Sequence, residues 1–422
     1  MRKLKEYRFS ELYRMDSGIS TTKAQAGHGA PFLSYKDIYN NPVLPEKLME
    51  KMDTSAEEQE RYSVKKGDIF LTRTSEVIDE LAMSGVAVQD YPNATFSGFA
   101  KRLRPLQKDI TYDKFMAFYL RSIFFRKIIN AKAVMTLRAS FNDKIFSDII
   151  LQLPDYDTQV KIGDLFYAIE CRIRNNNKIA MELESMAKTI YSYWFLQYEF
   201  PDEEGKPYRS SGGRMVWNEE LQKKVPVGWE VRGLEDFGTL SNGINYSKDE
   251  VGNKKYKIVN VRNMSNTSLL LERADMDDIY LNAKVAKNYL IQRNDILIAR
   301  SGIPGAIRIL EDDIEDIIYC GFIICLSLKS DQYRKYLAYK LKDYENTTAT
   351  TSGGTIMQNV NQSTLRSIRF VIPTEKYILA FNEKIDSIWM AMKSRIAENR
   401  ELVSLRDFLL PLLMNGQVGF KD

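Results

Sequence analysis

The chain has 422 residues, of which 44% are hydrophobic and 27% are charged. This length predicts two or three globular domains instead of one core, and the composition excludes a disordered or fibrous protein. The formal net charge of +4 is compatible with nucleic-acid binding but does not require it. The sequence lacks an apolar run of the roughly 18 residues that span a bilayer, and residues 1–12 lack the apolar core of a secretion signal. We therefore expect a soluble, cytoplasmic protein.

Cysteine and histidine usage argues against several kinds of active site. Cys171, Cys320 and Cys325 form no CxxC pair, which disfavours a disulfide framework and a thiolate zinc site. The only histidine is His28, in the loop-like stretch "AGHGAP". A Ser-His-Asp triad or a His-rich metal centre would have to be built around that one imidazole. We expect no catalytic residue and no metal ligand in this chain, and a surface position for His28.

The first half of the chain is repeated in the second half. The stretch "FSELYRMDSGIS" (9–20) matches "LEDFGTLSNGIN" (234–245), and "PFLSYKDI" (31–38) matches "KIVNVRNM" (257–264). Further along, "KKGDIFLTRT" (65–74) matches "QRNDILIARS" (292–301), and "FSGFAKRL" (96–103) matches "YCGFIICL" (319–326). Finally, "TLRASFNDKIFSDIILQLP" (136–154) matches "TIMQNVNQSTLRSIRFVIP" (355–373). The offset changes only from 227 residues (65 to 292) to 219 residues (136 to 355), which indicates a duplication with altered loops.

Each half changes its apolar period once. Short alternating runs with Gly and Asn turns predict β-strands, and 112–130 and 331–344 are amphipathic helical segments. After Pro154 and Pro373 the period becomes three and four, which predicts a long helix with a coiled-coil stripe. The stripe positions are Phe166, Ile169, Ile173, Asn176, Ala180, Leu183, Ala187, Ile190 and Trp194 in the first helix, and Ile385, Ile388, Met392, Ile396, Asn399, Leu402, Leu405, Leu409 and Leu413 in the second.

These patterns predict an α+β fold with a pseudo-twofold internal repeat: two similar mixed α/β domains separated by two long antiparallel helices that form a coiled coil. Asn176 and Asn399 lie in the middle of the stripes and would fix the register by pairing with each other. The alternative is that each helix packs only on its own domain. The expected parts are a domain at 1–154, a helix at 155–200, a linker at 201–224, a domain at 225–373, a helix at 374–416 and a tail at 417–422.

Three stretches resemble the specificity subunit of type I restriction-modification systems. They are the connector "GKPYRSSGGRMVWNEEL" with the following "VPVGWEVRGLEDFGTLSNG", the helix entry "LPDYDTQVKI", and the terminal "ENRELVSLRDFLLPLLMNGQV". The resemblance covers nearly the whole chain and its order of parts. One departure is visible at the second helix entry, where Ile378 stands at the position of Gln159.

The resemblance implies a DNA-reading subunit without catalytic activity. Its two target recognition domains would read the two parts of a split double-stranded DNA target, while the paired helices would act as a spacer and dock two methyltransferase subunits. Restriction and translocase subunits would complete the complex. The partners would use S-adenosylmethionine, ATP and magnesium, and this chain would bind no cofactor. The repeat supports this independently, because two similar but diverged halves suit two unequal half-sites on DNA.

Two other classes remain open. A stand-alone DNA-modifying enzyme is suggested only by Glu204 and Lys206 in "PDEEGK", which lie in a linker, and neither a base-methylation tetrapeptide nor a glycine-rich cofactor loop is present. A coiled-coil scaffold protein would show no salt-dependent DNA affinity.

Polar and basic residues in turns are the candidate DNA contacts. They are Lys36, Arg73, Thr74, Lys101, Arg102, Arg138, Ser140 and Asn142 in the first half, and Arg262, Arg300, Ser301, Ser352, Gly353, Gln358, Asn359 and Asn361 in the second. Three alternatives apply: strand-end solvation or a scaffold role for Arg73 and Arg300, helix capping for Asn142 and Asn361, and a solvated strand edge for 101–104.

The ends of both long helices carry more apolar residues than one seam needs. Trp194, Phe195, Phe408, Leu410, Leu412 and Met414 are therefore candidate partner-binding residues, with contact to the neighbouring domain as the alternative. Pro411 is expected to kink or end the second helix.

Overall fold

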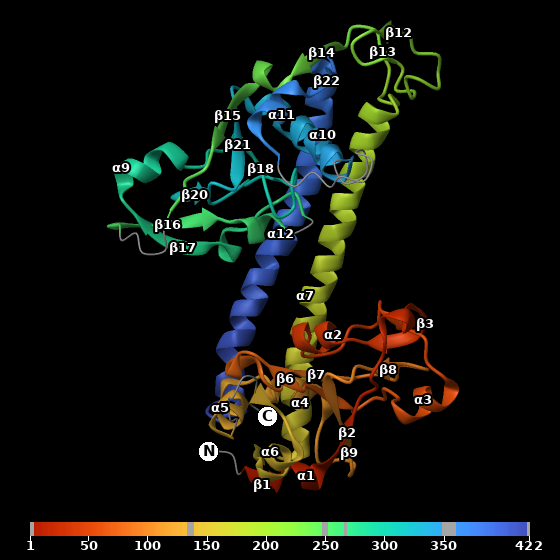
Figure 1. The fold of residues 1–422 in the computed structure, drawn as a ribbon, viewed down its shortest axis with the longest axis vertical. Helices are drawn as coiled ribbons and strands as arrows, with labels where there is room; N and C mark the ends of the chain where they lie inside the picture. Colours follow the sequence, from red (N-terminus) through yellow and green to blue (C-terminus); the bar gives the residue numbers. More distant parts are fainter. Residues whose placement is uncertain (1–3, 133–138, 247–251, 266–267, 348–359, 420–422) are drawn as a thin grey trace. The chain divides into compact units, whose positions relative to one another are not determined.

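The computed structural model describes residues 4–132, 139–246, 252–265, 268–347 and 360–419 (Figure 1). The chain forms two compact units, one made of Met1–Asn176 with Ala397–Asp422 and the other of Asn177–Ile396. They are called the first and the second unit below. Both long helices, α7 (Tyr156–Tyr191) and α12 (Glu375–Met414), contribute residues to both units.

The first unit contains most of the N-terminal half. Its elements are β1 (Lys5–Arg8), α1 (Phe9–Leu12), β2 (Tyr13–Ser17), η1 (Lys23–Gln25), β3 (Ala26–Leu33), α2 (Tyr35–Asn40), β4 (Lys51–Met52), α3 (Ala56–Arg61), β5 (Ile69–Thr72), β6 (Thr74–Ser75), η2 (Ile78–Glu80), β7 (Ser84–Val86), β8 (Thr95–Phe96), β9 (Ala100–Pro105), α4 (Asp113–Tyr119), α5 (Ile123–Lys132), β10 (Ala139–Ser140), α6 (Asp143–Asp148), β11 (Ile150–Leu153), the beginning of α7 and the end of α12.

The second unit follows. Its elements are the end of α7, η3 (Ser192–Leu196), β12 (Met215–Asn218), β13 (Lys223–Pro226), β14 (Glu230–Gly233), η4 (Leu234–Asp236), β15 (Gly238–Asn242), β16 (Lys254–Val259), α8 (Val261–Met264), η5 (Arg273–Asp275), β17 (Asp277–Leu281), α9 (Ala283–Ala286), η6 (Lys287–Tyr289), β18 (Asp295–Ala299), β19 (Ile307–Arg308), β20 (Ile317–Tyr319), β21 (Ile323–Leu328), η7 (Asp331–Tyr333), α10 (Arg334–Thr347), α11 (Gln362–Ser367), β22 (Arg369–Ile372) and the beginning of α12.

The two units share their sheet topology. In the first unit the strand orders are β2-β9-β5-β7, β4-β3-β8 and β1-β11, and in the second they are β15-β21-β18-β19, β17-β16-β20 and β14-β22. The strand directions also agree. In the first unit β3 runs parallel to β8 and antiparallel to β4, and in the second unit β16 runs parallel to β20 and antiparallel to β17. The predicted duplication is confirmed, and Figure 1 shows the β15-β21-β18 sheet of the second unit.

A buried aspartate begins the corresponding inner strand of each unit. The carboxylate of Asp68 accepts the backbone N–H of Lys65 at 2.8 Å, and that of Asp295 accepts the N–H of Gln292 at 2.8 Å. Both side chains are at most 3% exposed. The repeated "GDIF" and "NDIL" stretches therefore encode the same side-chain-closed turn before β5 and β18.

The long helices pack against each other within each unit. In the first unit the Nδ2 of Asn176 donates to the Oδ1 of Asn399 at 3.0 Å, so the predicted pairing of the two stripe asparagines is confirmed. Two ion pairs lie on the N-terminal side of Asn176 in α7, Arg172–Glu398 at 2.6 Å and Glu170–Arg406 at 3.8 Å. The earlier residue of α7 pairs with the later residue of α12, so the helices are antiparallel there.

In the second unit the pairing continues through apolar and aromatic side chains. The stripe residue Trp194 and its neighbour Tyr191 lie within 6.3 Å of Phe381 in α12, measured between ring centroids. Ala187 and Ile385 belong to the same buried cluster. The seam is therefore part of the hydrophobic core of the unit.

Four expectations need correction. Leu405 is 46% exposed, so it is not part of the helix seam. Helix α12 does not end at Pro411 but continues to Met414. Residues 201–224 are more than a linker, because β12 pairs with β13 there. His28 lies in strand β3 instead of a loop, with an exposed side chain.

Among the described helices, we find none with the length and apolar character that crossing a membrane requires.

Candidate nucleic-acid interface

Each unit has a junction where three segments meet at an arginine. In the first unit Arg73 follows β5, donates its backbone N–H to the carbonyl of Phe99 at 2.8 Å, and accepts the N–H of Phe141 at 2.8 Å. In the second unit Arg300 follows β18, donates to the carbonyl of Phe322 at 2.8 Å, and accepts the N–H of Val360 at 3.0 Å. The two junctions are equivalent in their backbone bonding.

Several of the predicted DNA-contact residues are brought together at these junctions. In the first unit Thr74 is the register partner of Ser140 in the β6–β10 pair, next to Arg73. In the second unit Ser301 follows Arg300 directly in the chain. Asn361 follows Val360, whose backbone N–H donates to the carbonyl of Arg300. The side chain of Arg73 is exposed, whereas Arg300 is half-buried and donates to the carbonyl of Gly321 at 3.2 Å.

A glycine in each unit lets two backbone segments meet beside the junction. A Cβ atom on Gly18 would lie 2.2 Å from the carbonyl oxygen of Ser97, and one on Gly243 would lie 2.2 Å from that of Cys320. No real side chain fits at such a distance, so both sites require glycine. The predicted match of Gly18 with Gly243 thus has a steric cause.

The same close approach fixes the turns before β9 and β21. Ile19 donates to the carbonyl of Phe96 at 3.0 Å and accepts from Gly98 at 2.8 Å, while Ile244 donates to the carbonyl of Tyr319 at 3.0 Å and accepts from Gly321 at 2.7 Å. The turn that follows is therefore held in the same way in both units.

These turns present two phenylalanines that the sequence analysis missed. Phe99 is 66% exposed and Phe322 is 61% exposed. They occupy matching positions of "FSGFAKRL" and "YCGFIICL". The sequence signal that could have identified them is the Gly-Phe dipeptide, which occurs at the same place in both halves. It lies in a turn, where a core phenylalanine is not expected.

Arg102 does not face solvent. It is 3% exposed, and its guanidinium donates to Asp16 at 2.8 Å and to the carbonyl of Ser63 at 2.7 Å. Burial alone would raise the pKa of Asp16, and the hydrogen bond and charge of Arg102 outweigh it and lower that pKa. Arg102 is thus a buried structural residue, and its expected phosphate contact is wrong. Its neighbour Lys101 is half-buried and donates to the hydroxyl of Ser17 at 2.9 Å.

The matched asparagines are helix caps. The Oδ1 of Asn142 accepts the N–H of Ile145 at 3.0 Å at the start of α6, and the Oδ1 of Asn361 accepts the N–H of Thr364 at 2.9 Å at the start of α11. The capping alternative is confirmed for both, and it explains why the same residue recurs without any appeal to base recognition.

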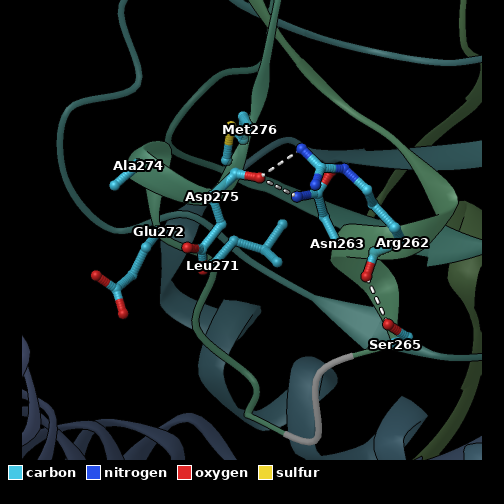
Figure 2. Close-up of a pocket in the computed structure, with 8 residues that line it drawn as sticks. All are labelled: Arg262, Asn263, Ser265, Leu271, Glu272, Ala274, Asp275 and Met276. Atoms are coloured by element: carbon cyan, nitrogen blue, oxygen red, sulfur yellow. Dashed lines mark hydrogen bonds between the residues drawn. The ribbon is translucent and has the colours of Figure 1, made fainter. Parts of the chain in front are cut away.

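Arg262 takes part in an internal network. It donates to the carboxylate of Asp277 at 3.1 Å and to the carbonyl of Asp275 at 3.2 Å. Figure 2 shows Arg262 and Asn263 both directed at that carbonyl, at a cavity of about 560 Å³. Its side chain is nevertheless 61% exposed, and its contact with DNA stays a prediction. Lys36, at the matching position of α2, is exposed.

Five of the candidate DNA contacts cannot be placed. Arg138, Ser352, Gly353, Gln358 and Asn359, together with the neighbouring Gly354, lie outside the described residues.

The predicted partner-binding residues divide into two groups. Trp194 and Phe195 are 6% and 5% exposed within the core of the second unit, and Met414 is 4% exposed within that of the first. For these three the expected exposed surface is wrong, because the helix ends pack on their own units. Leu410 and Leu412 are half-buried.

Phe408 differs, because it is 66% exposed. Phe408 and Leu405 line a hollow of about 620 Å³ on one side of α12. We call this side the α12 outer face. The residues of this face are Ala397, Arg400, Glu401, Ser404, Leu405 and Phe408.

Comparison with known families decides the class of the protein. The family model described as the type I restriction modification DNA specificity domain matches residues 3–185 and 226–398. The chain belongs to this family. Each match covers one copy of the duplicated half with part of its long helix, so the chain carries two specificity domains. The predicted family and the two-domain α+β fold are confirmed.

Specificity proteins are also found among its similar sequences and structures. The type I restriction enzyme HindI specificity subunit of Haemophilus influenzae is 24% identical over 92% of this chain and 94% of its own length. The MjaIX specificity subunit of Methanocaldococcus jannaschii is 22% identical over 94% and 88%. The crystal structure of the S subunit from M. genitalium shares the fold, with a TM-score of 0.54 and 14% identity over 100% of this chain and 97% of that one.

Proposed function

We propose that this chain is the non-catalytic DNA-recognition subunit of a type I restriction-modification complex, and that its two specificity domains read the two unequal parts of a bipartite target in double-stranded DNA. The observation that carries the proposal is the pair of junctions. Their backbone bonds are equivalent, but the side chains around them differ: Thr74 corresponds to Ser301, and the half-buried Lys101 to the buried Ile324. Two junctions with the same backbone bonding but different polar side chains suit the recognition of two different DNA sequences.

The junction residues have the chemistry that DNA recognition needs. An arginine at a strand end can contact a phosphate or, in a bidentate manner, the O6 and N7 of guanine. Arg73 has an exposed side chain for this purpose. Hydroxyl groups of Thr74 and Ser140 lie in the adjacent two-stranded pair, and Ser301 provides one beside Arg300.

The long helices support the other two roles. Because α7 and α12 each contribute to both units, we assign them the spacer role. The α12 outer face supplies Leu405 and Phe408 as exposed apolar residues for docking a methyltransferase subunit. Two methyltransferase subunits and the restriction and translocase subunits would then supply S-adenosylmethionine, ATP and magnesium chemistry.

The decisive experiment compares methylated positions in host DNA with and without the gene. A bipartite, asymmetric methylated motif is expected to disappear on deletion. Arg73→Ala and Arg300→Ala should then each relax only one part of that motif. An unchanged set of methylated motifs after deletion contradicts the proposal, and methylation or cleavage by the purified chain alone would support the enzyme alternative instead.

Docking on α12 is tested by co-purification. Phe408→Ala should reduce recovery of the methyltransferase with the chain, because a buried aromatic anchor often contributes about 2 kcal/mol to an interface. Phe124→Ala, another partly exposed phenylalanine of the first unit, is the matched control. Equal recovery of methyltransferase by the two variants would exclude the α12 outer face as the docking surface.

A further inference from the structure

The exposed phenylalanines Phe99 and Phe322 lie outside the buried clusters that the described residues form. Their side chains are 66% and 61% exposed. A single exposed apolar residue is ordinary on a protein surface. The same residue type at the same position of two diverged copies, exposed to the same degree, is not explained by that background.

The backbone beneath both rings is fixed. Each phenylalanine follows a glycine held by an inter-segment hydrogen bond, Gly98 to Ile19 at 2.8 Å and Gly321 to Ile244 at 2.7 Å. Its own carbonyl accepts the N–H of the junction arginine at 2.8 Å in both units. The ring is therefore presented from a rigid turn immediately beside the arginine that we assign to DNA.

We propose that Phe99 and Phe322 contact DNA bases directly, each by stacking on a base or by entering a base step, one in each part of the bipartite target. This rests on the proposed function and adds a contact type to it. Apolar side chains are known to act as wedges between base steps, and aromatic rings stack on bases with little regard to sequence.

The charges around the rings favour a nucleic acid over a protein partner. Phe99 is bonded through its backbone to Arg73 and is two residues from Lys101, and Phe322 is bonded to Arg300. An aromatic ring among cations suits a ligand with negative charge and flat apolar faces. The α12 outer face, in contrast, combines Phe408 with both Arg400 and Glu401.

The test uses the full chain in complex with its methyltransferase and a duplex that carries the methylated bipartite motif. The base analogue 2-aminopurine, whose fluorescence rises when it is unstacked, is placed in turn along each part of the motif. Wild type should raise the fluorescence at one step in each part. Phe99→Ala should abolish the rise in one part only, and Phe322→Ala in the other, so the unaffected part reports that the complex is intact.

Affinity gives a second readout. Each alanine variant should bind the duplex about tenfold more weakly, within the range seen for loss of one base–aromatic stack. The slope of log K against log salt should stay the same, because no phosphate contact is removed. Phe99→Tyr keeps the ring and should retain both signals. The matched controls are Leu106→Ala, at the other end of β9, and Tyr280→Ala in the second unit, which replace side chains 57% and 53% exposed.

The outcomes separate the two proposals. A wild-type complex that does not bind the bipartite duplex contradicts the proposed function itself. If wild type binds and both alanine variants bind equally well with the same fluorescence, the base contacts are overturned and the proposed function stands. Loss of the methyltransferase from either variant, without a change in DNA signal, would mark these rings as a protein interface and also overturn the inference.

Discussion

The buried asparagine pair between the long helices allows a quantitative prediction. Asn176 is fully buried, its Nδ2 donates to Asn399, and its Oδ1 has no hydrogen-bond partner among the described residues. Asn399→Leu removes the acceptor and leaves a buried amide with neither group paired. An unpaired buried donor costs about 1–3 kcal/mol, so this variant should lose about 2 kcal/mol of unfolding free energy.

The second substitution should reverse that loss. In the double variant Asn176→Leu with Asn399→Leu, both unpaired amide groups are gone and two apolar side chains face each other in the seam. Its unfolding free energy should equal or exceed that of wild type, so the coupling energy equals the loss of about 2 kcal/mol in Asn399→Leu plus the loss measured for Asn176→Leu alone. Polar residues at such positions are known to set register at a cost in stability, so the double variant should also show looser register of α7 against α12.

The distribution of tryptophans provides the assay. Trp194, Trp217, Trp229 and Trp389 all lie in the second unit, whereas the asparagine pair belongs to the first. Urea unfolding followed by circular dichroism reports both units, and tryptophan fluorescence reports only the second. The single variant should shift the dichroism transition with little change in fluorescence. If the two substitutions destabilise additively, the pair is not coupled and the reasoning is refuted.

Three further predictions follow from the site. Asn142→Ala and Asn361→Ala should each cost about 1 kcal/mol of stability while aspartate at either position restores it, and unchanged urea midpoints would disprove the capping role. Arg73→Ala should lower the slope of log K against log salt for DNA binding by about 1, measured by titration calorimetry, without changing stability. Arg102→Ala should instead cost about 2 kcal/mol of stability, measured by urea unfolding. The carboxylate of Asp68 also pairs with the half-buried guanidinium of Arg104, at 2.6 and 2.7 Å. Asp68→Ala should therefore cost about 3 kcal/mol of stability, because it leaves Arg104 without this partner, and Asp68→Asn should cost less, since the amide oxygen can still close the turn.

The repeat was predictable because steric and turn-forming residues determine it. Glycines at a close backbone approach, aspartates that close a turn and asparagines that cap a helix each have few substitutes, so they stay recognisable after the rest has diverged. The helix entries show the limit. Gln159 is buried and bonds to the carbonyls of Ile110 and Pro154, while Ile378 at the matching place is buried among apolar residues. A buried hydrogen-bonded glutamine and a buried isoleucine each stand at the start of a long helix. The sequence alone does not show that these two residues hold equivalent positions.

The direction of side chains was less predictable. Strand β9 lies between β2 and β5, and the buried side chain of Arg102 donates to Asp16, its register partner on β2. Residue type suggested a solvated cation, but the inner position of the strand decided otherwise. The prediction of an exposed surface at Trp194 and Phe195 was wrong for a similar reason. An apolar helix end indicates a contact surface, but it does not show whether another protein or the same unit covers that surface.

What differs between the copies strengthens the functional assignment. Arg102, paired with Asp16 across β2 and β9, corresponds to the buried Cys325, whose cross-strand partner is Ser241. The core has therefore exchanged an ion pair for small side chains while the strand order stayed the same. Packing tolerates that change, yet the exposed arginine and phenylalanine of the first junction have identical residue types in the second. Since the fold does not demand an exposed phenylalanine, their retention in both copies suits a ligand that both units contact, and we propose that this ligand is DNA.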